Sequence, residues 1–292
     1  SSLAVDIARA YDRRGREGAA LAEADDQVIT RRDSGATASG LARAVVLERA
    51  WREPVEAAGA FADEPGCVVL LSDGSRAGRW SYVLRRPVRT LALAGGEDGD
   101  AMAALRDLLD GEADFAADGP PLQGGVVGLA AYEFGARLEP AMPQERSAWP
   151  DLSAGLYDSV LAFDHAERRV LAVGRGATTE AARRRAEAAA ADIDTAIALP
   201  RLDGLAQTFE EIGDAPGHAA AVADVTARIA TGEIFQANIA RRWRGRLAAG
   251  ARPFDAFAEL ARQSPAPYAA YLRLEGRALV SNSPERFLAV DR

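Results

Sequence analysis

Lysine is absent from this chain of 292 residues, and its 35 basic side chains other than histidine are all arginines. No side-chain amine can therefore act as a nucleophile or form a Schiff base. Cysteine occurs once, as Cys67 in the run Cys-Val-Val-Leu-Leu, which excludes an internal disulfide and predicts a buried thiol. Histidine occurs twice, as His165 and His218, and with one cysteine these distant residues form no zinc-binding spacing.

A net excess of positive charge is lacking, and so are long apolar runs. The formal net charge is -8 and the isoelectric point is about 5.0, which argues against a nucleic-acid-binding protein with a basic face. No apolar run is long enough to span a bilayer, and no signal peptide opens the chain. We therefore expect no nucleic acid, no membrane and, with a single cysteine, a cytoplasmic setting.

What is present is enough apolar surface for a sizeable core, because hydrophobic residues make up 48% of the chain. Residues 1–44 are the exception, since they are rich in Arg, Asp, Ala and Gly and poor in large apolar side chains. We interpret them as an atypical tail, linker or remnant that does not pack on the core, and we expect order to begin near Val45.

Periodicity predicts an α+β protein. Apolar residues at helical spacing predict helices over Ala101–Asp110, Thr178–Ala198, His218–Gly232 and Pro253–Arg262. Short β-rich runs predict strands over Cys67–Ser72, Arg79–Leu84, Val88–Leu93, Leu156–Asp164, Arg168–Gly174, Glu233–Trp243, Tyr268–Leu274 and Ala278–Ser283. The Gly-punctuated run Gly124–Tyr132 is typical of a strand that leads into a helix. Because regular strand-helix-strand units are scarce, we predict stacked antiparallel β-sheets with helices on the outside.

Most polar or Gly-rich patterns have a structural explanation. Gly124, Gly125 and Gly128 match neither a Walker loop nor a dinucleotide fingerprint, so close backbone packing is the preferred interpretation. Gln236 and Asn238 share the polar face of a predicted strand, which is either solvated or lines a pocket.

Two further charged patterns are expected to face solvent. His165 lies in the hairpin-tip sequence Asp-His-Ala-Glu-Arg-Arg, where solvent is its expected environment. The basic run Arg241–Arg246 contains one aromatic residue and, in an acidic chain, is interpreted as a solvated strand end.

Glu285 is the sharpest catalytic candidate. It follows Pro284, which belongs at a strand edge or bulge because it lacks a backbone donor. A carboxyl group held there acts as a general acid if burial raises its pKa. The alternative is a surface glutamate paired with Arg286.

Five segments, taken together and in order, resemble the chorismate-utilising enzymes over Val45–Arg292. They are PLQGGVVGLAAYEFGARLEP (121–140), PDLSAGLYDSVLAFDHAERRV (150–170), GEIFQANIARRW (232–243), SPAPYAAYLRLEG (264–276) and SNSPERF (281–287). The resemblance implies a fold of stacked antiparallel sheets. It divides the chain into an N-terminal domain over 45–204 and the beginning of a chorismate-binding catalytic domain over 205–292.

The resemblance also implies a chemistry. The substrate would be chorismate, the cofactor Mg²⁺ with ligands expected beyond residue 292, and the ammonia source a glutamine amidotransferase subunit. Glu285 would be the acid that protonates the departing C4 hydroxyl. Members of the family place a Lys nucleophile or its replacement shortly after the Ser-Pro-Glu-Arg-Phe motif, so we expect this chain to be a truncated fragment that is inactive alone.

Within the family, three features resemble component I of aminodeoxychorismate synthase, which makes 4-amino-4-deoxychorismate for folate biosynthesis. They are Asn238 in FQANIA, Ala269 in PAPYAAYL, and the sequence YEFGARLE. Component I of anthranilate synthase, of tryptophan biosynthesis, remains an alternative. A third is a non-catalytic module that binds an amino acid or the amidotransferase.

Some members of the family bind L-tryptophan in the N-terminal domain. The positions that match the binding residues are Ser72, Trp80, Ser81, Tyr82, Val83, Pro267, Tyr268 and Ala269. Ser72 is matched less directly, because Asp73 also fits. For Trp80 and Tyr82 the preferred interpretation is that they are aromatic residues of the core.

Overall fold

The computed structural model describes residues 43–75, 78–95, 99–109, 115–139, 148–200 and 204–288, so the tail predicted over 1–44 lies outside the described residues except for its last two positions, which belong to the first strand. The strands are β1 (Arg43–Ala50), β2 (Val68–Leu71), β3 (Trp80–Leu84), β4 (Arg89–Leu93), β5 (Gly125–Ala130), β6 (Leu152–Tyr157), β7 (Ser159–Asp164), β8 (Arg169–Gly176), β9 (Ala206–Ile212), β10 (Arg242–Leu247), β11 (Tyr268–Leu274) and β12 (Arg277–Ser283). The helices are α1 (Pro54–Gly59), α2 (Ala101–Leu108), α3 (Gly135–Leu138), α4 (Thr179–Asp192), α5 (Ala215–Ala230) and α6 (Pro253–Gln263), with 3-10 turns η1 (Tyr132–Phe134) and η2 (Ile193–Thr195).

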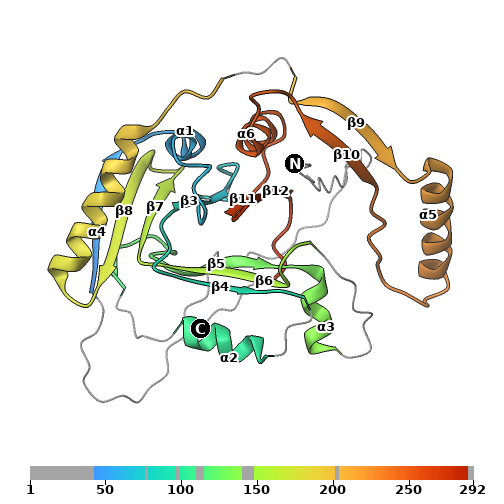
Figure 1. Ribbon diagram of the computed structural model, residues 1–292, viewed down its shortest axis with the longest axis horizontal. Helices are drawn as coiled ribbons and strands as arrows, with labels where there is room; N and C mark the ends of the chain where they lie inside the picture. The colour runs from blue at the N-terminus through green and yellow to red at the C-terminus, as the bar shows by residue number, and fades with distance from the viewer. Residues whose placement is uncertain are drawn as a thin grey trace.

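A seven-stranded antiparallel sheet forms the centre of the molecule, in the order β1-β8-β7-β3-β2-β11-β12. Helices α1, α4 and α6 cover one of its faces, as Figure 1 shows. The core on that side includes Cys67 and Phe163 from the sheet and Phe254 and Phe257 from α6, all fully buried. The predicted burial of Cys67 is confirmed, and burial raises the pKa of its thiol to about 12.

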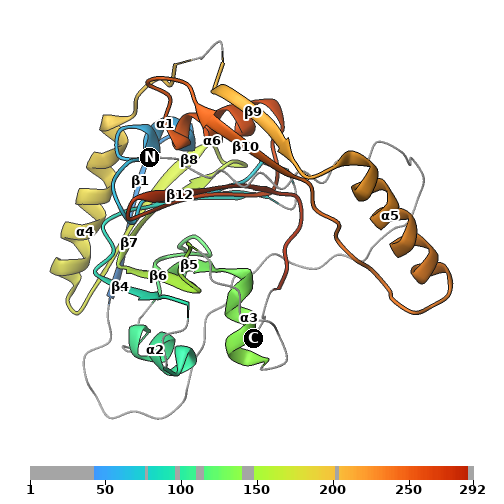
Figure 2. The same ribbon diagram turned by 45° about the vertical axis from the view of Figure 1, so that its right-hand side comes forward.

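The other face of the central sheet packs on a three-stranded antiparallel sheet in the order β4-β6-β5 (Figure 2). Tyr82, Leu171 and Leu272 from the central sheet meet Tyr157 from β6 in a second core. Nearly all residues of β7 and β8 are buried, and they supply the two cores in turn because successive strand residues point to opposite faces. The predicted class, stacked antiparallel sheets with outer helices, is confirmed.

Glycine permits close approach of the chain at two predicted positions. A Cβ on Gly128 would meet the backbone of Ser153 on the neighbouring strand, which confirms close packing as the reason for this glycine. Gly124 has φ +120, a conformation that other residues rarely adopt. The Gly-rich run therefore forms strand β5 of the three-stranded sheet together with Gly124, the residue just before that strand.

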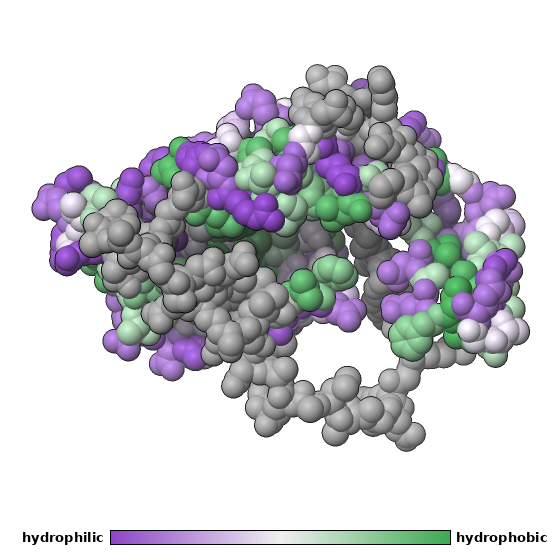
Figure 3. All heavy atoms as spheres, turned by 90° about the horizontal axis from the view of Figure 1, so that it is seen from below, coloured by the Kyte–Doolittle hydropathy of each residue, from purple (hydrophilic) through white to green (hydrophobic). Residues whose placement is uncertain are grey.

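The ribbon β9-β10 and helix α5 extend from one side of the molecule in Figures 1 and 2. No residue of α5 is buried, and Val222 and Ile229 are 41% and 43% exposed. Figure 3 shows hydrophobic and hydrophilic residues side by side on this helix. None of the helices in the described part of the chain is both long and apolar enough to cross a membrane.

The strand predicted over Glu233–Trp243 is wrong. Gly232, with φ +75, ends α5 with backbone bonds from Gly232 to Ile229 and from Glu233 to Arg228, the pattern of a helix C-cap. The chain then has no helix or strand until β10 begins at Arg242. Phe235 is 93% exposed, so the alternating pattern faces no core and forms no strand.

The apolar face predicted for the helix over Ala101–Asp110 is also only partly correct. Leu108 is buried, but Met102 and Leu109 are 43% and 55% exposed. Asp100 caps α2 by accepting bonds from the backbone of Met102 and Ala103. The short helix therefore packs by its two ends, Ala101 and Leu108, rather than by the whole predicted face.

Candidate functional site

The positions predicted for amino-acid binding come together on three neighbouring strands of the central sheet. Strand β2 lies between β3 and β11. Leu70 on β2 is paired with Tyr82 on β3 and with Ala270 on β11, so segments far apart in sequence form one continuous row. Ser72 follows β2, and Pro267 precedes β11. The fold thus places all the predicted segments in one region.

These residues are nevertheless divided between the two faces of the sheet. Tyr82 is buried in the core between the two sheets, with Trp80 packed against that core and stacked on Tyr82 at 6.5 Å and 14°. Val83 and Ala269 are buried in the opposite core, under the helices. A ligand between the sheets would therefore meet Trp80 and Tyr82, and not Val83 or Ala269.

The two predicted serines are already engaged in internal hydrogen bonds. Ser81 is fully buried, and its hydroxyl accepts a bond of 2.9 Å from the backbone N–H of Ser72. The Ser72 hydroxyl donates to the carbonyl of Gly78 and accepts a bond of 3.3 Å from the N–H of Gly74. In this arrangement both hydroxyls hold the loop after β2 in place.

His165 was expected to face solvent, and this expectation is wrong. Its Nε2 lies 2.7 Å from the hydroxyl of Ser81, and its ring meets the ring of Trp51 edge-on at 5.1 Å. The hairpin tip folds back onto the loop after β2, which leaves the imidazole half-buried. Burial lowers the pKa of His165 below its ordinary value, with Glu53 opposing and Arg168 reinforcing the shift.

Asp164, beside His165, is fully buried and ion-paired. Arg79 donates to its two carboxylate oxygens at 2.8 and 2.6 Å, and the backbone N–H groups of Ala166 and Glu167 donate as well. Burial alone would raise the pKa of Asp164, but the bonds from Arg79 and the backbone outweigh it and keep the pKa below its ordinary value. The pair fixes the hairpin tip that carries His165.

Glu285, the predicted acid, is exposed and lies just after the end of β12 at Ser283. Within the described residues no hydrogen bond or ion pair of Glu285 is seen, and its exposed position agrees with the surface residue of the alternative interpretation. Upstream, Asn282 anchors the strand by donating to the carbonyl of Ser264 at 2.9 Å. Pro284 thus marks the point where the chain leaves the sheet, as expected for a residue without a backbone donor.

The remaining candidates lie apart from this region. Gln236 and Asn238 are exposed in the irregular segment after α5. Among the described residues, no group of three or more His, Cys, Asp or Glu side chains could hold a metal ion. The described residues therefore provide no Mg²⁺ site, and ligands beyond residue 292 stay a prediction.

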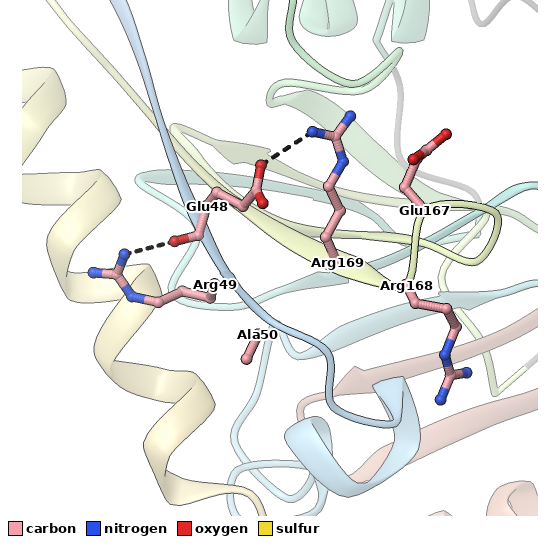
Figure 4. Close-up of a pocket in the computed structure, with 6 residues that line it drawn as sticks. All are labelled: Glu48, Arg49, Ala50, Glu167, Arg168 and Arg169. Atoms are coloured by element: carbon pink, nitrogen blue, oxygen red, sulfur yellow. Dashed lines mark hydrogen bonds and ion pairs between the residues drawn. The ribbon is translucent and has the colours of Figure 1, made fainter.

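A charged hollow of about 460 Å³ lies at the turn that carries His165 (Figure 4). It is formed by the end of β1 and the β7-β8 turn, and its lining residues are Glu48, Arg49, Ala50, Glu167, Arg168 and Arg169. Arg169 pairs with Glu48 at 3.0 Å, and Arg49 donates to the carbonyl of Glu48 at 2.8 Å. None of the residues predicted for substrate or amino-acid binding lines it.

Comparison with known proteins places the chain in a family. Residues 68–292 match the family model of chorismate binding enzymes. The chain belongs to this family. The resemblance stated from the sequence motifs is thereby confirmed, and the match includes β2, β3, β11, β12 and Glu285.

Curated relatives of this chorismate-binding family member carry two different names. Aminodeoxychorismate synthase component 1 of Escherichia coli (strain K12) is 28% identical over 230 residues, 73% of this chain and 49% of that protein. Anthranilate synthase component 1 of Streptomyces coelicolor is 34% identical over 227 residues, 71% and 43% of the respective chains. Anthranilate synthase component 1 1 of Haloarcula marismortui is 32% identical over 247 residues, which are 78% of this chain and 50% of that protein.

The chain spans about half the length of the curated relatives it matches. A solved structure, anthranilate synthase component I from Streptococcus pneumoniae TIGR4, superposes with a TM-score of 0.55 at 19% identity. It covers 72% of this chain and 51% of that one. At this identity the likeness shows a shared fold, in agreement with the stacked sheets described above.

Proposed function

We propose that this chorismate-binding family member is part of component I of aminodeoxychorismate synthase. In that role the protein replaces the C4 hydroxyl of chorismate with ammonia from a glutamine amidotransferase subunit and forms 4-amino-4-deoxychorismate, a folate precursor. The observation that carries the proposal is the family match over residues 68–292. A cytoplasmic location would follow from this role.

The choice of product rests on sequence features that the comparisons do not decide. Asn238 and Ala269 resemble the aminodeoxychorismate branch, and named relatives of both kinds match at similar identity. Anthranilate synthase component I, whose product forms by attack of ammonia at C2, is therefore the alternative within the same family.

Glu285 is proposed as the acid of this reaction. It would donate its proton to the oxygen of the C4 hydroxyl as that group leaves. Such an acid must keep its proton near neutral pH, which enzymes achieve by burying the carboxyl group. Because Glu285 is exposed in the structure, the role requires that substrate or further protein covers it. The exposed position at the end of β12 leaves space for such a cover.

The test is an assay of the protein expressed from its complete coding sequence, with chorismate, an ammonium salt and Mg²⁺. We expect 4-amino-4-deoxychorismate as the product, resolved from anthranilate by chromatography. Anthranilate as the product would overturn the proposed branch in favour of the alternative. Chorismate that stays unchanged under conditions where a related synthase is active would overturn both.

The 292-residue chain itself is expected to be inactive in the same assay. It contains no lysine, the residue that the resemblance assigns as the nucleophile, and its proposed acid Glu285 is exposed to solvent. Turnover of chorismate to either aminated product by the purified chain would contradict this expectation.

A module that binds an amino acid is the second candidate, favoured by one observation. Trp80 and Tyr82 are stacked at the edge of the core between the sheets, next to Leu70 and Ala270. We propose that L-tryptophan binds against this aromatic pair. Titration calorimetry with L-tryptophan tests the idea, with Trp149→Phe as a control for loss of a tryptophan elsewhere. Binding that survives Trp80→Ala unchanged would contradict it.

A further inference from the structure

The end of strand β12 is the point at which the segment with Glu285 leaves the central sheet. Ser283 is the last residue of β12 and is paired with Tyr268 on β11. Pro284 follows, and it has no backbone N–H for a further bond of the ladder. Because the ladder ends at Ser283, the place of Glu285 depends on how firmly the last residues of β12 are held.

A side-chain hydrogen bond holds this end of β12 to helix α6. The Nδ2 amide of Asn282 donates to the backbone carbonyl of Ser264 at 2.9 Å. Ser264 is the C-cap of α6, and the last carbonyls of a helix have no partner within the helix itself. The amide of Asn282 therefore satisfies an acceptor at the helix end and ties the strand to the helix with the same bond.

The bond lies on the face of the strand that the helices cover. Ala278 and Val280 belong to the core under the helices, and Asn282 follows them at the same spacing of two residues, so its side chain faces the same way. Its cross-strand neighbour Ala269 is 3% exposed and belongs to this core as well. A longer side chain than that of Ala269 would compete with the amide for space.

Helix α6 is a firm support for this bond. Phe254 and Phe257 on α6 are fully buried in the core of the central sheet. The last turn of the helix closes with a bond of 2.9 Å from the N–H of Ser264 to the carbonyl of Leu260. The core thus determines where the carbonyl of Ser264 lies, and the bond from Asn282 passes that constraint on to the end of β12.

We propose that Asn282 is a positioning residue for Glu285, because its amide fixes the end of β12 against α6 and so the place from which Glu285 delivers a proton. This inference rests on the proposed function, in which Glu285 is the acid. A general acid must lie within hydrogen-bond distance of the oxygen that it protonates. Since a displacement of about 1 Å can cost about 10²-fold in rate, loosening the strand end lowers kcat.

The kinetic test uses the protein expressed from its complete coding sequence, with chorismate, an ammonium salt and Mg²⁺. Asn282→Ala removes the donor, and Asn282→Asp removes it while keeping the size of the side chain, because a carboxylate only accepts. In both variants kcat should fall about tenfold, with a much smaller change in KM for chorismate.

A double variant shows whether Asn282 acts through Glu285. The variant Asn282→Ala/Glu285→Gln should have the same kcat as Glu285→Gln alone, because a positioning residue has no effect once the group that it positions has lost its transferable proton. A residue that only stabilises the fold would add its own loss to that of Glu285→Gln.

Hydrogen exchange measures the geometry without any catalysis. In the 292-residue chain, Asn282→Ala should speed the exchange of backbone amides between Ser281 and Phe287, because the end of β12 is no longer held. Gln263→Ala is the matched control. Gln263 lies in the last turn of α6 and donates its side-chain amide to Glu259, so this variant removes an amide from the same helix end without releasing β12. It should leave both the exchange and kcat unchanged.

The outcomes separate the positioning role from the proposed function. Chorismate left unchanged by the unaltered protein would overturn the proposed function, and this role with it. Normal kcat in Asn282→Ala, beside an active unaltered protein, would overturn the positioning role alone. So would losses that multiply in the double variant, since Asn282 would then act independently of Glu285. Unchanged exchange at the end of β12 would also overturn it, because the bond to Ser264 would not be what holds the strand.

Discussion

At the residue scale, a short chain of hydrogen bonds joins three separate parts of the fold. The backbone of Ser72 donates to the hydroxyl of Ser81, which in turn bonds the imidazole of His165 at 2.7 Å. The ring of Trp51 packs against the same imidazole. The loop after β2, strand β3, the β7-β8 turn and the end of β1 therefore meet at one titratable group.

The first prediction concerns the pH dependence of stability at this group. Burial lowers the pKa of His165 in the folded protein, so the unfolded chain takes up the proton first as the pH falls. The stabilisation by neutral His165 is complete above the unfolded pKa of about 6.5 and is lost as the pH falls toward the lower folded value. Urea unfolding measures the free energy of unfolding at about pH 7.5 and at about pH 5.5. The drop in this free energy between the two pH values should be smaller for His165→Gln than for the unaltered protein.

The control is the second histidine. His218 lies on α5, where its Nε2 is 3.2 Å from the carbonyl of Ile239, and it has no contact with the Ser81 network. His218→Gln should keep the pH response of the unaltered chain. An identical response in His165→Gln would mean that the titration of this imidazole is not linked to folding.

The second prediction concerns Glu285 in the protein expressed from its complete coding sequence. Glu285→Gln keeps the size of the side chain but removes the transferable proton. If Glu285 protonates the leaving hydroxyl, kcat should fall by about 10²-fold or more, with a much smaller change in KM for chorismate. Steady-state kinetics measures both quantities, and the exposed position of the residue predicts unchanged folding.

Glu275→Gln is the matched control, because Glu275 is also exposed and lies in the turn between β11 and β12. It should leave kcat unchanged. Near-normal kcat in both variants would show that Glu285 is a surface residue, and the role implied by the family would not apply to this chain.

Single residues could be predicted from sequence where their neighbours in sequence decide their surroundings. The burial of Cys67 follows from its apolar run, and the end of β12 from Pro284. The surroundings of His165 could not be predicted, because Ser81 is 84 residues away and Trp51 lies in another connection. Its partner depends on the pairing of β3 with β7, which no local pattern specifies.

At the element scale, α4 lies close against strand β8. Its buried face consists of alanines, Ala182, Ala186, Ala189 and Ala190. Gly174 on β8 faces this helix, and a Cβ placed on it would lie against the backbone of Ala182 and Ala186. Small residues on both sides thus permit a helix-to-sheet distance that a larger side chain would prevent.

The third prediction tests this packing. Gly174→Ala should destabilise the protein by about 1–3 kcal/mol, because the added methyl group forces α4 away from the sheet. Chemical unfolding followed by circular dichroism measures the change. Gly204→Ala is the control, since a Cβ there meets nothing within 4 Å. A Gly174→Ala protein as stable as the Gly204→Ala protein would show that α4 can shift without cost.

The elements themselves were predictable to different degrees. Helix α6 was predicted with its start at Pro253, because its apolar residues repeat at helical spacing and its core face is formed by Phe254 and Phe257. Strand β4 was predicted as a strand, but its place in the three-stranded sheet depends on pairing with β6. The error at Glu233–Trp243 has the same origin, since alternation alone does not supply a neighbouring strand.

At the scale of the whole molecule, the central sheet and its core cross the predicted domain boundary at residues 204 and 205. Strands β11 and β12 continue the sheet formed by residues before the boundary, with Ala269 paired to Leu71. Helix α6 packs Phe254 and Phe257 into the same core as Phe61 and Phe163. The hydroxyl of Tyr271 donates to the carbonyl of Ala62 at 3.0 Å. The boundary stays a prediction, and these contacts supply its test.

The last prediction is that a chain shortened to residues 43–204 does not fold cooperatively. It would lack Phe254, Phe257 and Tyr271, each fully buried and each worth about 1.5–3 kcal/mol of burial. Together they approach the total stability of a typical domain, about 5–15 kcal/mol, and their loss exposes the edge of β2. Thermal unfolding followed by circular dichroism should show a broad transition at lower temperature than in the chain of residues 43–283, a control that keeps every strand and helix described above. A sharp transition at an unchanged midpoint in the shorter chain would instead establish residues 43–204 as a domain that folds on its own.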